Sequence, residues 1–168
     1  MSLSRLFLAL PVVALALALP ATAGAAKRAK PVNPVTTAVA IGHHYWGAVP
    51  CGGQLRVLAR QRLAPGLHPT TDAWVTFDTP LGANNLDAPA STYTNCTIAL
   101  ARWRWPRDAS MRADWDILCT TVTHELGHLL GRHHDATPGS IMAPVFTDYS
   151  SVPRICKANR PARLARHR

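Results

Sequence analysis

Two histidines and a glutamate at close spacing are the residues of this chain best suited to chemistry. His124 and His128 are four residues apart, so on a helix they lie on one face, one turn from each other. Two imidazoles in this arrangement can bind one zinc ion at about 2.0–2.1 Å. Glu125 follows the first histidine and is placed to act as a general base on a water at the metal. The spacing therefore predicts a metal site that can activate water.

The residues after this pair favour a third histidine ligand. Gly131 has no Cβ, so it can adopt the left-handed conformation that ends a helix and reverses the chain. The turn would bring back His134 as the third ligand and leave the fourth position open, as in catalytic zinc sites. His133 and Asp135 flank His134 and are the alternatives, although the G-x-x-H spacing favours His134.

The whole pattern, H-E-x-x-H-x-x-G-x-x-H, is followed by Asp135 and then by Met142 within S-I-M-A-P. It resembles the metzincin clan of zinc endopeptidases, which combine this motif with a methionine-containing turn. Pro144 stands where astacins and serralysins have tyrosine, so the chain looks closer to the matrixins. The resemblance implies that Met142 forms an apolar floor beneath the histidines. It also implies that Asp135 supports the site by hydrogen bonds near the helix or the methionine turn.

A long helix ending at Leu130 must carry the first two histidines. Asp114 and Asp116 are both candidates for its N-cap. A helix wheel separates two faces, with His124 and His128 opposite the apolar residues. These apolar residues are Leu118, Cys119, Val122, Leu126, Leu129 and Leu130. The helix is therefore expected to bury one face and to offer the other to a cleft.

Three further segments favour strands, and one favours a helix. Alternating or β-branched residues predict strands at 54–62, 73–78 and 95–101, and a first helix is expected over 35–46. Residues 106–113 read as a connector. The resemblance implies an α/β (α+β) sandwich with a twisted mixed sheet, an active-site helix and a small C-terminal subdomain.

The resemblance also suggests that the strand 95–101 is the sheet edge that pairs with substrate. An ordinary central strand is the alternative. Phe146 or Tyr149 could wall the pocket that takes the residue after the scissile bond. The proposed substrate-pairing residues are Cys96, Thr97, Ile98, Ala99 and Leu100.

Four regions are expected along the chain. Residues 1–25 have the charge and apolar run of a signal peptide, with an uncleaved anchor as the alternative. Residues 26–37 form a basic, proline-containing linker or short pro-segment, 38–156 the zinc metalloprotease domain, and 157–168 a basic tail. The sequence thus predicts a protein that is secreted rather than inserted in a membrane.

The cysteine count agrees with export. An even number of cysteines in an exported chain indicates two disulfides, with three pairings open. The four candidates are Cys51, Cys96, Cys119 and Cys156.

The net charge of +9 sits largely in the two ends of the chain and raises polyanion or cell-surface binding as one alternative function. No nucleic-acid motif supports a nucleic-acid partner. A loop at 80–89 offers Asn and Asp oxygens for calcium, but without the spacing of a calcium loop, so a plain surface loop is preferred. The Arg-, Ala- and Pro-rich composition suggests a small bacterial form.

Together these features predict a secreted, monomeric, zinc-dependent endopeptidase that cuts peptide bonds with a zinc-activated water and Glu125 as general base. A zinc-containing binding module without activity is the second alternative, which the intact Glu125 disfavours. The sequence does not indicate the natural substrate.

Overall fold

The structure is a computed structural model that describes residues 32–145 and 151–161. Phe146, Tyr149, the predicted signal peptide and most of the predicted tail lie outside these residues. Among the described residues, no helix is both long and apolar enough to cross a bilayer. The elements in chain order are α1 (Pro34–Trp46), η1 (Cys51–Gly53), β1 (Arg56–Arg60), β2 (Ala73–Asp78), η2 (Ala90–Thr92), β3 (Thr94–Ala101), α2 (Asp108–Ala113), α3 (Trp115–Leu129) and α4 (Arg154–Ala158).

The three strands form one mixed sheet in the order β1-β3-β2, with β1 parallel and β2 antiparallel to β3. The mixed sheet agrees with the α+β prediction. The prediction that residues 95–101 form a sheet edge is wrong, because β3 has a strand on each side. Its residues from Cys96 to Ala101 are all buried, so both faces of the strand are covered. Burial on both faces is typical of a central strand.

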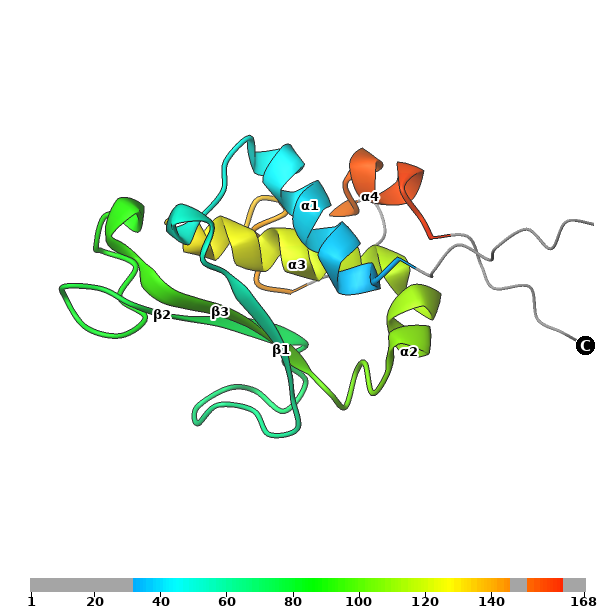
Figure 1. The fold of residues 1–168 in the computed structure, drawn as a ribbon, viewed down its shortest axis with the longest axis horizontal. Helices are drawn as coiled ribbons and strands as arrows, with labels where there is room; N and C mark the ends of the chain where they lie inside the picture. The colour runs from blue at the N-terminus through cyan, green and yellow to red at the C-terminus, as the bar shows by residue number, and fades with distance from the viewer. Residues whose placement is uncertain (1–31, 146–150, 162–168) are drawn as a thin grey trace, which may run out of the picture. The chain divides into compact units, whose positions relative to one another are not determined.

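Helix α3 lies between the sheet and α1 (Figure 1). Its apolar residues face the core as predicted, except that Leu130 is only half-buried. Those of α3 that are fully buried are Leu118, Cys119, Val122, Leu126 and Leu129.

Helix α1 begins earlier than the predicted domain boundary. Asn33 caps it by accepting hydrogen bonds from the backbone N–H groups of Val35 (2.9 Å) and Thr36 (3.4 Å). Pro34 suits the first helical position, because its fixed φ is already helical and its missing N–H would have no partner within the helix there. The last four residues of the predicted 26–37 linker are therefore helical.

Residues 108–113 form the helix α2 rather than the predicted connector. Met111 of this helix is buried in the core, and this apolar contact stabilises the helical segment. The next helix, α3, has Asp114 at its N-cap position, as predicted, but the side chain makes no capping hydrogen bond. Its carboxylate instead accepts from the Trp105 indole N–H at 3.2 Å and lies 2.7 Å from Nη2 of Arg104.

Two disulfides resolve the pairing that the sequence left open. Cys51–Cys96 joins η1 to β3, and Cys119–Cys156 joins α3 to α4. Each closes a long loop, of 45 and 37 residues, so each restricts the unfolded chain substantially. The first bond holds the sheet and the second holds the helix that carries the histidines.

Candidate metal centre

The three predicted histidine ligands come together at the C-terminal end of α3. His124 and His128 stand one turn apart on this helix, and His134 follows its last turn. The turn is made by Gly131 at φ 78°, as its lack of a Cβ predicts. The N–H of Arg132 bonds to the Gly127 carbonyl (2.9 Å) and that of Gly131 to the His128 carbonyl (2.9 Å). This pair of bonds is a Schellman motif, which reverses the chain and returns His134 to the other two rings.

The spacing of the ring nitrogens fits a zinc ion. One nitrogen from each of the three histidines lies within 4.8 Å of the others. Nε2 of His128 and Nε2 of His134 are 3.2 Å apart. Two nitrogens bound tetrahedrally to zinc at about 2.0–2.1 Å would stand about 3.3 Å apart. Among the described residues, this is the one group of three or more His, Cys, Asp or Glu side chains with such spacing.

Backbone carbonyls orient two of the rings, those of His124 and His128. Nδ1 of His124 lies 2.7 Å from the Ile141 carbonyl oxygen, and Nδ1 of His128 lies 2.7 Å from that of Arg132. Each carbonyl takes the N–H at Nδ1, so Nε2 is left with a lone pair for a metal. This second hydrogen bond is common among metal-binding histidines because it fixes tautomer and ring angle. Nδ1 of His134 has no such partner within the described part of the chain.

Burial favours the neutral form of two of the three histidines in the absence of a metal. Desolvation by burial lowers the pKa of His124 to about 4, and the neighbouring rings of His128 and His134 add to the effect. The pKa of His128 is lowered for the same first reason. Neutral imidazole is the form that binds metal, so His124 and His128 are in the metal-binding form at neutral pH.

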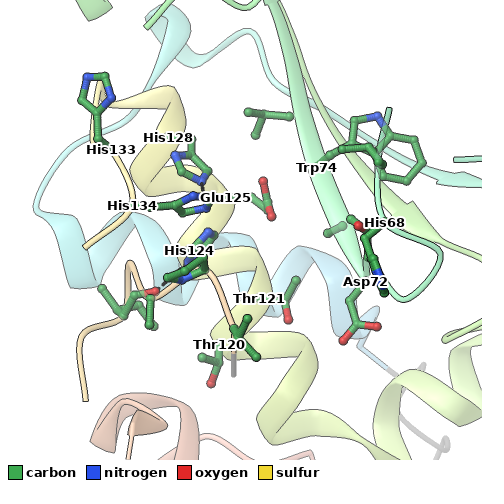
Figure 2. A pocket seen from close by; sticks show the side chains of 18 of the residues that line it. His68, Asp72, Trp74, Thr120, Thr121, His124, Glu125, His128, His133 and His134 are labelled. Carbon is green, nitrogen blue, oxygen red and sulfur yellow. Dashed lines mark hydrogen bonds between the residues drawn. The ribbon is translucent and has the colours of Figure 1, made fainter. Parts of the chain in front are cut away.

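Glu125 is also buried, with 6% of its surface exposed, and burial raises the pKa of its carboxyl to about 8. It faces the same cleft as the histidines, as predicted (Figure 2). A carboxyl whose pKa lies near neutrality can take up a proton and release it again during a reaction. Its position and its pKa both suit a general base.

Met142 supports the helix from below, as the resemblance implied. It is buried, and a Cβ built on Gly127 would lie 2.5 Å from its sulfur and 2.9 Å from Cζ2 of Trp46. The glycine between Glu125 and His128 thus allows the methionine turn to pack directly against the helix backbone. Because Ile141 precedes Met142, the same packing places the carbonyl that orients His124.

Asp135 is exposed and organises the loop between His134 and Met142. Its carboxylate accepts hydrogen bonds from the N–H (2.9 Å) and the hydroxyl (2.7 Å) of Thr137. These bonds lower the pKa of Asp135. Its own backbone N–H bonds to the Met142 carbonyl at 2.9 Å. Asp135 therefore supports the site through the loop and lies outside the cluster of possible ligands.

Comparison with known families decides between the possible zinc proteins. The matrixin family (peptidase family M10) matches residues 48–157. The chain belongs to the matrixin family. A search of curated proteins finds no match, and a search of solved structures finds none either. Matrixins are zinc metalloendopeptidases, and the histidine cluster of this matrixin is positioned as a zinc site.

The catalytic cleft of this matrixin has a volume of about 900 Å³ and two walls. The histidine wall consists of α3 from Thr120 onward and the loop 131–144. The strand wall consists of residues 67–77, which include most of β2. Figure 2 shows Trp74 and Asp72 on the strand wall across from Glu125 and Thr121.

The free edge of the sheet that faces this cleft is β2, which the sequence prediction missed. The N–H of Ala101 bonds to the carbonyl of Asp72, so Asp72 turns its backbone toward β3. By the alternation of an antiparallel pair, Ala73 and Val75 turn their N–H and C=O groups away from β3. Both residues line the cleft. The sequence signal that could have identified the edge is hydropathy. The less apolar strand, β2, contains buried and half-buried residues, whereas most residues of the more apolar β3 are buried.

The loop at 80–89 uses its side-chain oxygens internally. Oδ1 of Asn84 accepts from the N–H of Phe77 at 2.9 Å, and Oδ1 of Asn85 accepts from the N–H of Asp87 at 2.9 Å. These bonds hold the loop against the end of β2. The preference for a plain surface loop over a calcium loop stays a prediction.

Proposed function

We propose that His124, His128 and His134 hold the catalytic zinc of this matrixin and that Glu125 is its general base. The single observation that carries the assignment is the convergence of the three ring nitrogens beside a buried carboxyl in one cleft. The carbonyl bonds to His124 and His128 support it, since they leave Nε2 of each ring free for a metal.

A zinc ion held by His124, His128 and His134 would supply Lewis-acid chemistry, which makes water a better nucleophile and the scissile carbonyl a better electrophile. Glu125 takes the proton of the attacking water on a carboxylate oxygen and returns it to the leaving amine. In the metal-free protein, burial raises the pKa of Glu125 to about 8, which suits a carboxyl that must both take up and release a proton. The histidine rings stay neutral, and their carbonyl partners hold them in place throughout.

The substrate in this proposal is an extended peptide that adds to β2 as a further strand. Ala73 and Val75 offer their free N–H and C=O groups to its backbone. Backbone pairing gives affinity without selecting a sequence. Antiparallel addition would place the carboxyl side of the scissile bond toward Asp72, where β2 begins, and beside Thr121.

The test compares wild-type protein with Glu125→Ala for cleavage of casein, with and without a zinc chelator. We expect Glu125→Ala to retain one bound zinc and to lose turnover by roughly 10²–10⁴-fold, the usual contribution of general-base catalysis. Chelation should abolish the remaining cleavage. Turnover that survives in Glu125→Ala would remove Glu125 from the mechanism. A zinc-loaded wild type that cuts nothing would favour the binding-module alternative.

Metal content separates the third ligand from its neighbours. His134→Ala should lose bound zinc, whereas Asp135→Ala should keep it and lose thermal stability through the loop. His133 is exposed and belongs to no ligand cluster among the described residues, so His133→Ala is the matched control. Retention of zinc by His134→Ala would show that the third ligand is misassigned.

We further propose that the protein is a secreted monomer of bacterial type, whose catalytic domain begins with α1. Matrixins are typically secreted, and the two disulfides fit an oxidising compartment. Mass spectrometry of the protein from the culture medium would test export and the position of signal cleavage.

A further inference from the structure

The strand wall of the cleft carries a carboxylate that the proposed reaction does not use. Within the described part of the chain, the residues that line the cleft include two acids, Glu125 and Asp72, and no lysine or arginine. Asp72 immediately precedes β2. Figure 2 shows it level with Thr121, at the opposite end of the cleft from His128.

The backbone around Asp72 is fixed, while its side chain is poorly partnered. The Asp72 carbonyl accepts from the N–H of Ala101 at 2.8 Å, and the preceding carbonyl, of Thr71, accepts from the Trp103 indole at 3.2 Å. The Asp72 carboxylate accepts no hydrogen bond from the described residues. Its one ion pair is with Nε of Arg104, at the long distance of 4.0 Å.

Arg104 does not neutralise the Asp72 carboxylate, because its guanidinium makes its close ion pair with Asp114. Its Nη2 lies 2.7 Å from Asp114, and its buried Nε has no hydrogen-bond partner within the described residues. The cluster of Asp72, Arg104 and Asp114 therefore retains one negative charge, and of the three only Asp72 lines the cleft. Burial raises the pKa of Asp72 and the nearby Asp114 raises it further, while Arg104 lowers it. The charged form thus lacks a close cation.

The part of α3 opposite Asp72 is small and polar. Thr120 uses its hydroxyl to bond the Asp116 carbonyl at 2.7 Å. Thr121 has no side-chain partner within the described residues and also lines the cleft. A substrate side chain entering here would meet the two threonines on α3, with the Asp72 carboxylate on the opposite wall (Figure 2).

We propose that Asp72 is a specificity-determining residue that selects a lysine or arginine side chain on the carboxyl side of the scissile bond. Antiparallel pairing with β2 brings that part of the substrate past Ala73 toward Asp72. An ammonium or guanidinium group would supply the close cation that Asp72 lacks. This inference rests on the proposed protease function and names its substrate class.

The experiment measures kcat/KM for internally quenched peptides that differ at one position on the carboxyl side of the cleaved bond. Lysine is compared with norleucine, which has the same stem without the charge, and with glutamate. We expect wild type to prefer lysine over norleucine by roughly two- to fivefold, the effect of one partly solvated ion pair. Asp72→Asn should reduce that ratio to about one, with the norleucine peptide still cleaved.

Asp108→Asn is the matched control, because it removes the same charge from the exposed first turn of α2, outside the cleft lining. It should keep the lysine preference. A purely structural role of Asp72 would slow all peptides equally and leave the ratio unchanged, which would overturn the inference. A wild type without any lysine preference would overturn it as well.

Casein cleavage separates the two failures. If casein is cut in a Glu125-dependent way but lysine and norleucine peptides are cut equally, the protease assignment stands and only the role of Asp72 falls. If zinc-loaded wild type cuts neither casein nor any peptide, both fall together.

Discussion

The two walls of the cleft are built in different ways. The histidine wall takes its ligands from a short segment, and the Schellman turn at Gly131 returns His134 to the helix within a few residues. The strand wall depends on pairing with β3, which follows β2 by a long loop in sequence. The positions of the histidines are therefore determined by local sequence, whereas the surface that holds the substrate is determined by tertiary contacts.

Removal of a disulfide should have the largest effect, and it tests whether the two walls of the cleft are independent. Replacing Cys119 and Cys156 by alanine should cost roughly 3–4 kcal/mol of unfolding free energy, and replacing Cys51 and Cys96 about as much. The first pair holds α3 and the second holds β3, so their functional effects should differ. Denaturant titration measures the cost, while zinc affinity and KM are measured on folded protein.

We expect the first double variant to lose zinc affinity and the second to raise KM for peptides with zinc affinity retained. Equal loss of zinc affinity in both would contradict the independence of the two walls.

Gly127→Ala tests the packing beneath the histidine wall. Helix propensity alone would favour alanine by about 1 kcal/mol. The new Cβ would lie 2.5 Å from the Met142 sulfur, and overpacking of this kind costs roughly 1–3 kcal/mol. We expect a lower melting temperature together with weaker zinc binding, since the loop that orients His124 must move. Thr121→Ala, on the cleft side of the same helix, is the control, and a stabilised Gly127→Ala would show that Met142 can shift freely.

Glu125→Gln tests how the buried carboxyl of Glu125 makes the stability of the metal-free protein depend on pH. Burial raises the pKa of Glu125 in the folded state to about 8, from an unfolded value near 4.5. The stability that this protonated carboxyl contributes is therefore complete below about pH 4.5 and is lost as the pH rises through about 8. Metal-free wild type should lose at most about 5 kcal/mol over that interval relative to Glu125→Gln. Parallel stability curves for the two metal-free proteins, measured by urea unfolding at several pH values, would contradict this expectation.

Asn84→Gly is a smaller test of the strand wall. It removes the acceptor for the Phe77 N–H at 2.9 Å, while glycine tolerates the φ of 56° at this position. We expect a loss of about 1 kcal/mol in stability and a modest rise in KM, without change in zinc affinity. Asn84→Asp keeps the acceptor and should behave as wild type. A fall in zinc affinity in Asn84→Gly would link the two walls.

The same contrast explains what the sequence could predict. Helical spacing and one glycine placed His124, His128 and His134, because their relation depends on a few consecutive backbone angles. The three strands were located by hydropathy, but their order was not, since pairing depends on residues far apart. The family resemblance implied an edge at residues 95–101, but the burial of these residues belongs to a central strand.

Local signals also failed where a side chain found a tertiary partner. Asp114 has the residue type and position of an N-cap, yet its carboxylate binds Arg104 and the Trp105 indole. The helix α2 was read as a connector because its short sequence carries little periodicity, and the burial of Met111 gives it an apolar face. The partner of Cys119 was similarly fixed by the fold, through α4.

Among the described residues, no carbonyl holds Nδ1 of His134, and this has a consequence for metal exchange. His124 and His128 are held by carbonyls and lie partly or fully buried, whereas His134 is exposed. When the metal is removed, we expect the His134 ring to move away first, while His124 and His128 keep their positions on the helix. Chelators should therefore strip the metal through this side, at a rate set by the 131–135 turn rather than by unfolding of the domain.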